Sequence, residues 1–115
     1  MYIESIPYFD ADGDNTAQTV KTTGGRIHYL EVSNPNATDA YIQFYDAAAG
    51  SVTVGTTTPV QSFLVPAGDG TKDAGTEKTF NFPWKFNDAI TYACTTTATG
   101  STDPTTGLVV NILYS

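Results

Sequence analysis

Residues 26–47 read RIHYLEVSNPNATDAYIQFYDA, and they contain two runs rich in β-branched and aromatic residues, at 26–33 and 40–46. Such runs are typical of β-strands. The segment between them contains Pro35 and two asparagines, which favour a turn because proline fixes one backbone dihedral and asparagine tolerates unusual ones. The stretch therefore predicts two antiparallel strands joined as a β-hairpin.

Side chains alternate between the two faces of the predicted strand at 40–46. Ile42 and Phe44 share one face, which we assign to the core. The opposite face carries Tyr41, Gln43 and Tyr45. Exposed tyrosines suit either a protein interface or a sugar-binding platform, because each combines a flat apolar ring with a hydroxyl.

Similar short runs recur along the chain between turn residues, and no segment has a convincing helical period. Further strands are expected at 2–8, 59–65, 77–82, 89–98 and 107–114, with a weaker candidate at 18–23. About seven or eight short antiparallel strands predict an all-β chain, folded as a single-domain β-sandwich or jelly-roll-like unit with extended loops.

The predicted domain spans residues 1–115, with 1–25 as a candidate N-terminal arm that includes an acidic turn. Two segments rich in glycine and threonine, 66–77 and 95–107, offer little to bury, and we expect exposed loops or extended arms there. In the strand at 77–82, Phe80 and Phe82 are predicted core rings, and Pro83 is predicted to end the strand.

The acidic turn has Asp10, Asp12 and Asp14 at alternate positions, as the start of a calcium-binding EF-hand loop does. Such a loop needs glycine at its sixth position and glutamate at its twelfth, where this chain has Asn15 and Lys21. We therefore predict an Asx-type turn without a bound metal, and regard the three aspartates only as weak candidate ligands.

Charge and composition exclude several classes of function. The net charge of -7 would repel a nucleic-acid backbone. We find neither a signal-peptide pattern nor a stretch long enough to span a membrane, so we expect synthesis in the cytoplasm and no membrane partner. His28 and Cys94 are the only residues of their kinds, and both fall on apolar strand faces, which disfavours a catalytic dyad. We predict no enzyme activity, no catalytic residue and no cofactor.

Two segments carry a resemblance to a known class of protein: 41–70, which reads YIQFYDAAAGSVTVGTTTPVQSFLVPAGDG, and 83–115, which reads PWKFNDAITYACTTTATGSTDPTTGLVVNILYS. Together they resemble small virion proteins of tailed bacteriophages. The shared motifs are YIQFYD, GTTTP, VPAG, and YACTTTATGS followed by a proline and a final apolar strand that ends in tyrosine. These motifs are structural rather than catalytic.

Within that class, the chain is similar to capsid cement, or decoration, proteins. The resemblance implies a location on the capsid exterior of the virion, with the major capsid protein as partner. It also implies a homo-oligomer, with a trimer favoured, that stabilises contacts between neighbouring capsid subunits. Small size without disulfides favours oligomerisation as well. The candidate interface residues are Tyr2, Ile3, Ile6, Tyr8, Tyr41, Tyr45 and Trp84.

Two other functions remain open on the sequence. The first is a carbohydrate- or receptor-binding module of a phage tail or fibre, in which Trp84, Tyr41 and Tyr45 would provide the stacking surfaces. The second is a low-copy tail or head-completion component.

Overall fold

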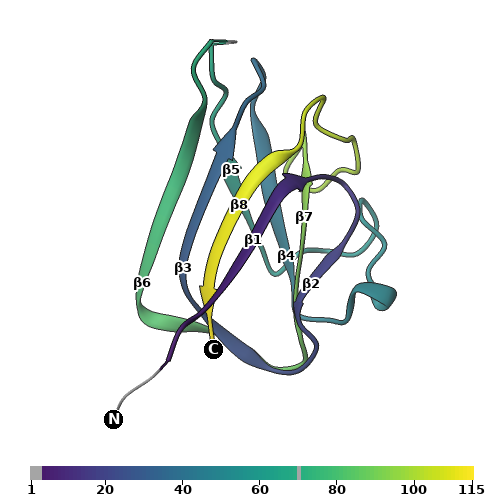
Figure 1. The fold of residues 1–115 in the computed structure, drawn as a ribbon. Helices are drawn as coiled ribbons and strands as arrows, with labels where there is room; N and C mark the ends of the chain where they lie inside the picture. The colour runs from purple at the N-terminus through teal and green to yellow at the C-terminus, as the bar shows by residue number, and fades with distance from the viewer. Residues whose placement is uncertain (1–3, 70) are drawn as a thin grey trace.

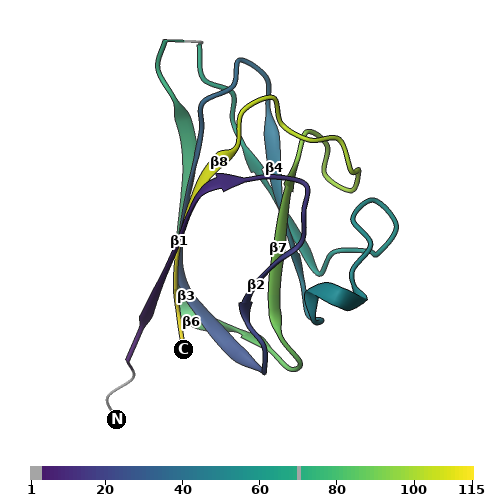
Figure 2. The same cartoon turned by 45° about the vertical axis from the view of Figure 1, so that its right-hand side comes forward.

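The computed structural model describes residues 4–69 and 71–115, and it is a sandwich of two four-stranded sheets (Figures 1 and 2). All strand pairs are antiparallel, which confirms the predicted all-β sandwich. Within the described residues, no helix is long and apolar enough to cross a membrane. The first sheet has the order β1 (Ile6–Gly13), β8 (Leu108–Tyr114), β3 (Gly25–Asn34) and β6 (Ala74–Phe86). The second sheet has the order β2 (Gln18–Lys21), β7 (Ile90–Thr95), β4 (Ala40–Tyr45) and β5 (Gln61–Val65), and the short 3-10 helix η1 (Ala49–Ser51) follows β4.

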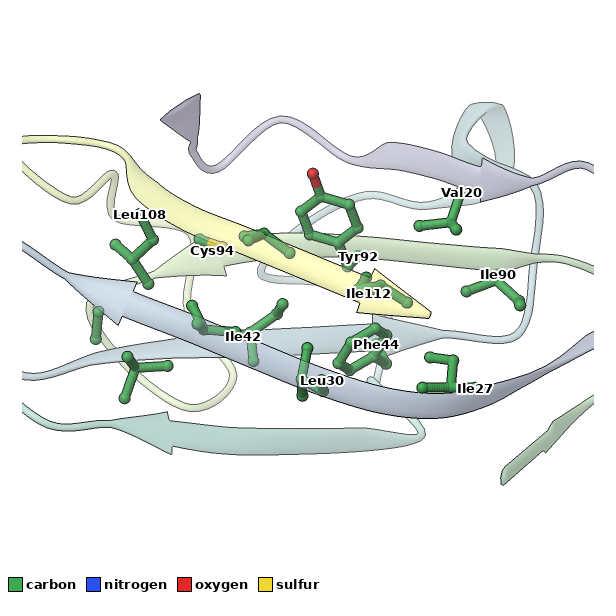
Figure 3. Packing of buried hydrophobic residues seen from close by; sticks show 14 of the residues in the cluster. Val20, Ile27, Leu30, Ile42, Phe44, Ile90, Tyr92, Cys94, Leu108 and Ile112 are labelled. Carbon is green, nitrogen blue, oxygen red and sulfur yellow. The ribbon is translucent and has the colours of Figure 1, made fainter. Parts of the chain in front are cut away.

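The core lies between the inner faces of the two sheets (Figure 3). Ile42 and Phe44 are fully buried there, as predicted from their alternation. The ring of Phe44 packs edge-on against Trp84, with 5.2 Å between the ring centroids. Burying an aliphatic or aromatic side chain of this size contributes about 1.5–3 kcal/mol. The side chains buried between the two sheets are therefore the main source of stability. The other large buried apolar side chains are Ile27, Leu30, Ile90, Tyr92, Leu108, Ile112 and Phe86.

The predicted hairpin at 26–46 is wrong, because β3 and β4 belong to different sheets. The connecting segment crosses from one sheet to the other, and the buried Asn34 side chain holds this crossing in place. Its amide donates hydrogen bonds to the carbonyls of Thr38 (2.9 Å) and Val65 (3.1 Å), while its oxygen accepts the backbone N–H of Asn36 at 2.9 Å. The asparagines therefore make an inter-sheet arch instead of a tight turn.

The N-terminal region also differs from the prediction. The expected strand at 2–8 begins later, at Ile6, and continues to Gly13, where it pairs with β8. Most of the candidate arm at 1–25 is thus part of the sandwich, since β1 and β2 are edge strands of the two sheets and the chain crosses between them (Figure 2). Residues 1–3, which include the candidate interface residues Tyr2 and Ile3, lie outside the described part of the chain.

Strand β6 is longer than predicted and carries a large bulge. In its pairing with β3, residues 80–83 oppose the single residue His28. Pro83 lies within this bulge, where its missing N–H costs no ladder hydrogen bond, and it does not end the strand. Phe80 packs against the core as predicted, whereas Phe82 is 90 % exposed, which corrects its assignment to the core. The bend near the lower end of β6 is visible in Figure 1.

Loops cover the outer face of the second sheet, and the segment at 95–107 is one of them, not an extended arm. Gln43 points to this outer face and is fully buried. Its amide donates to the carbonyl of Gly100 at 3.0 Å and to the hydroxyl of Thr95 at 2.7 Å. The hydroxyl of Ser62 on β5 donates to the carbonyl of Ala98 at 2.7 Å. These bonds fix the loop on the sheet, because a buried polar group without a partner is costly.

The loop after β4 covers the same face. The hydroxyl of Thr91 donates to the carbonyl of Ala47 at 2.6 Å. Gly55 has a φ of 90°, which favours glycine, and a Cβ at this position would lie 2.8 Å from the Cβ of Ser101. The two covering loops therefore touch each other, and in Figure 2 both lie on the side of β4 and β7.

Asp46 holds the turn between β6 and β7. Its carboxylate accepts the backbone N–H groups of Asn87 (2.9 Å), Asp88 (2.8 Å) and Ala89 (3.3 Å). Partial burial by itself raises the pKa of Asp46, but the three hydrogen bonds outweigh this effect and hold the pKa below its usual value.

This lowered pKa predicts an acid-sensitive contribution to stability. A carboxyl group with a lower pKa in the folded state stabilises the fold above the unfolded pKa of about 4, and the contribution is lost as the pH falls through the folded value. We expect Asp46→Asn to lower the free energy of unfolding near pH 7 by at most about 1 kcal/mol, because solvent still screens this partly buried carboxylate. Urea denaturation at a series of pH values should show the variant and the wild type converging in acid, below the unfolded pKa of about 4.

Asp88→Asn is the control for this experiment, because it removes the same charge from the same turn without removing the hydrogen-bond acceptor. The free energy of unfolding of Asp88→Asn should not approach that of the wild type as the pH falls. A difference between Asp46→Asn and the wild type that stays constant down to the lowest pH would contradict the assignment.

Candidate functional site

The covering loops lie on the second sheet, and none of them crosses the outer face of the first sheet (Figures 1 and 2). We call it the open face. Apolar side chains lie side by side on it, because Pro7 on β1 and Tyr29 on β3 are both paired with Leu113 of β8 between them. Phe9 is 64 % exposed and Leu113 is 36 % exposed. A patch of exposed apolar side chains on a polar surface is typical of a protein-binding site.

Two adjoining hollows lie on the open face. The apolar hollow, of about 280 Å³, is lined by Pro7, Phe9, Tyr29 and Leu113, with Glu31 at its border. The acidic hollow, of about 310 Å³, is lined by the same Glu31 together with Asp73 and Glu77. Because Glu31 borders both, the two hollows form one continuous strip across β1, β8, β3 and β6.

The acidic hollow has a concentrated negative charge. Glu31 and Glu77 stand directly opposite each other on β3 and β6. The hydroxyl of Tyr29 donates to Glu31 at 3.2 Å. Desolvation, then the hydrogen bond to Glu31 and the charges of Glu31 and Glu77, raise the pKa of Tyr29, so its hydroxyl stays a neutral donor.

A second candidate site lies where the edge strands β5 and β6 approach each other. We call it the aromatic groove: it is lined by Gln61, Phe63, Phe80, Phe82 and Trp84 and has a volume of about 350 Å³. Its half-buried rings Trp84 and Phe63 are arranged edge-on, with 6.0 Å between the ring centroids. The Nζ of Lys78 lies 5.0 Å from the centroid of Phe63, within the range of a cation–π interaction.

The predicted interface residues do not converge on one surface. Ile6 is 48 % exposed on β1, and Tyr41 is half-buried on the outer face of β4. Tyr45 is only 1 % exposed because the loops cover it, so its prediction as an interface residue is wrong. Its hydroxyl donates to the oxygen of Gln43 at 2.5 Å. Trp84 lies in β6, beyond the predicted end of that strand at Pro83, and its half-buried ring packs against the core.

Tyr8 is half-buried at the edge of the sandwich. Its ring packs edge-on against that of Tyr92, and the two hydroxyls are 3.0 Å apart. The hydroxyl of Tyr92 in turn donates to the carboxylate of Asp10. Burial, followed by these hydrogen bonds to Asp10 and Tyr8, raises the pKa of Tyr92. The hydrogen bonds among Tyr8, Tyr92 and Asp10 therefore link β1 to β7.

The three aspartates of the acidic segment are not gathered around one point. Asp10 and Asp12 lie on β1, at a bulge where the backbone N–H of Asp12 donates to the Asp10 carboxylate at 2.9 Å. Asp14 accepts the backbone N–H of Thr16 at 2.9 Å, which is the predicted Asx-type turn. Among residues 4–69 and 71–115, no group of three His, Cys, Asp or Glu side chains is arranged to hold a metal ion.

Cys94 and His28 have unrelated surroundings. Cys94 on β7 is fully buried, and burial, followed by the charges of Asp10, Asp14 and Asp103, raises the pKa of its thiol. A buried thiol of raised pKa is a poor nucleophile. His28 lies on the other sheet, and its Nε2 is 2.9 Å from the hydroxyl of Ser115.

Sequence reasoning missed Phe9 and Leu113 on the open face and Phe63 in the lining of the aromatic groove. The signal for Phe9 was present: it alternates with Tyr8, so a strand that continued past residue 8 would have placed the two rings on opposite faces. The sequence matches no protein-family model, and no curated protein is significantly similar to it. The open face and the aromatic groove are two surfaces of this β-sandwich on which binding can be argued from geometry.

Proposed function

We propose that this protein is a structural virion protein: a capsid cement, or decoration, protein that binds the outer surface of a phage head and stabilises contacts between major capsid subunits. The observation that supports this proposal is the difference between the two outer faces of the sandwich. Loops cover the second sheet, whereas the first sheet presents Phe9 and Leu113 to solvent across paired strands. A single broad binding face suits a protein that lies flat on a much larger one.

The chemistry of the open face agrees with this role. Burial of an exposed ring such as that of Phe9 in a partner's pocket contributes favourable binding free energy. Aromatic residues near the centre of an interface often supply much of its binding energy. The net charge of -7 opposes contact with the packaged genome. Repeated copies on a shell, as a trimer or another homo-oligomer, would multiply a modest interface into strong attachment by avidity.

A second candidate function, a carbohydrate- or receptor-binding module of a phage tail or fibre, is supported by the aromatic groove. Trp84 and Phe82 offer flat faces, and the exposed Gln61 beside them offers a polar group. A glycan array would test this function. Phe82→Ala is the informative variant because Phe82 is 90 % exposed, whereas loss of Trp84 would also damage the core. Reproducible glycan binding that disappears in Phe82→Ala would favour the module over the cement protein.

The copy number of the protein on purified particles distinguishes the proposals. Quantitative mass spectrometry of particles from the source lysate would compare it with the most abundant shell protein. A ratio of the same order as the shell protein is expected for a cement protein. A few copies per particle would favour a tail or head-completion component, and none would overturn the virion assignment.

The open face itself is tested by Phe9→Asp. The substitution puts a charge in the middle of the apolar hollow, and we expect the affinity for particles assembled without this protein to fall at least about tenfold. Val60→Asp is the matched control, because Val60 is 49 % exposed and follows the covering loop of the second sheet. Equal binding by both variants, measured by co-sedimentation, would exclude the open face as the contact surface.

A further inference from the structure

We infer that the open face binds a protein segment in which an apolar side chain adjoins a lysine or arginine. The inference rests on the proposed function, in which that segment belongs to the capsid shell, and it adds the chemistry by which the shell would be recognised. It is carried by the way in which the apolar and acidic hollows share one residue, Glu31.

The strip on the open face has two chemically distinct halves. Its β1–β8 half is apolar, with Pro7, Phe9 and Leu113. Its β3–β6 half has the carboxylates of Glu31, Glu77 and Asp73. A partner that covered the whole strip would place apolar atoms over the first half and would have to neutralise the second, since buried carboxylates need a cation or several donors.

The acidic half is unfavourable in the isolated protein. Glu31 and Glu77 are cross-strand neighbours, and like charges in that position destabilise a sheet. Only one hydrogen-bond donor, the hydroxyl of Tyr29, reaches Glu31 in the described structure. A lysine or arginine placed between the two carboxylates would remove their repulsion and gain two charged contacts at once.

The same charges argue against other occupants. A second copy that docked with its acidic half against this one would bring Glu31, Glu77 and Asp73 toward their own counterparts, on a chain whose net charge is -7. Nucleic acid is repelled for the same reason. A segment that is both apolar and basic satisfies the two halves together.

The experiment combines zero-length cross-linking with a charge-neutralised variant. Particles carrying the protein are treated with a carbodiimide, which joins a carboxylate to an amine in direct contact, and the cross-links are mapped by mass spectrometry. In parallel, the double variant Glu31→Gln/Glu77→Gln is titrated onto particles assembled without this protein, at low and at moderate salt. The matched control is Glu4→Gln/Asp88→Asn, which makes the same change in charge at exposed positions that do not line the strip.

We expect cross-links from Glu31 or Glu77 to a lysine of the shell protein. We also expect the double variant to bind about threefold to tenfold more weakly at low salt than the control, with a smaller dependence of its affinity on salt. Because neutralisation relieves the repulsion between the two glutamates, the variant should be at least as stable to urea as the wild type, which separates lost binding from lost folding.

Three results would overturn the inference in different ways. The first result is a high occupancy of the particles by the protein, together with an unchanged affinity of the double variant and cross-links that do not involve Glu31 or Glu77. It would disprove the basic–apolar partner but would leave the cement function as a proposal. Cross-links from Glu31 to lysines of a second copy would assign the open face to self-association instead. Particles that carry no copies would remove both the inference and the proposed function.

Discussion

Phe44→Ala is expected to lower the free energy of unfolding by about 3–5 kcal/mol, the usual cost of removing a fully buried aromatic ring. The ring lies at the centre of the core, and its neighbours come from both sheets. Its centroid is 5.2 Å from that of Trp84 on β6 and 6.2 Å from that of Phe63 on β5. Alanine would leave a cavity that these large rings cannot fill without breaking their own contacts.

The measurement is guanidinium or urea denaturation followed by far-UV circular dichroism. Phe82→Ala is a close control, because it removes the same atoms from a ring that is 90 % exposed, and it should change the stability by no more than about 0.5 kcal/mol. Similar losses in the two variants would mean that the core is not organised around Phe44. Since a domain of this kind is stable by only about 5–15 kcal/mol, the expected loss is a large share of the total.

Asn34→Ala is expected to cost about 2–4 kcal/mol, although it removes only a small polar side chain. The reason is that Asn34 is fully buried and serves several backbone groups of the inter-sheet arch. Without it, the carbonyls of Thr38 and Val65 and the backbone N–H of Asn36 lose their partner. Each buried polar group left without a hydrogen bond costs about 1–3 kcal/mol, less whatever water or local movement recovers.

Asn34→Asp separates the two roles of this side chain. It retains an oxygen that can accept the N–H of Asn36, but it loses both donations and introduces a charge at a buried position. We expect its stability at neutral pH to stay well below that of the wild type. The exposed Asn81→Ala is the control and should be nearly neutral in the same urea titration. A neutral effect of Asn34→Ala would show that the arch does not depend on this network.

The fold class was predictable because alternation is a local property. Ile42 and Phe44 alternate with polar neighbours, and the two-residue period of a strand is enough to place them in the core. The sheet to which a strand belongs is not local. The segment between β3 and β4 has the composition of a hairpin turn, but its asparagines bond to Val65 and Thr106, far away in the sequence, and those bonds make it an arch.

The candidate site was less predictable, for two physical reasons. Tyr45 lies on the face opposite the core, as its position in the strand implies, but the loops bury it. The sequence of the strand itself does not indicate that distant loops cover this face. Phe82 has the correct alternation for a core residue, but the bulge in β6 shifts the register and turns the ring outward. Phe9 was missed because the predicted strand ended at residue 8.

The bulge in β6 also has a consequence for how the molecule behaves at high concentration. A long edge strand exposes a straight row of N–H and C=O groups, on which another chain can add and start a fibre. In β6 that row is broken, because residues 80–83 bow outward against a single residue of β3 and Pro83 has no N–H to offer. Open-ended polymerisation along this edge is thereby opposed at the very place where Phe82 is exposed.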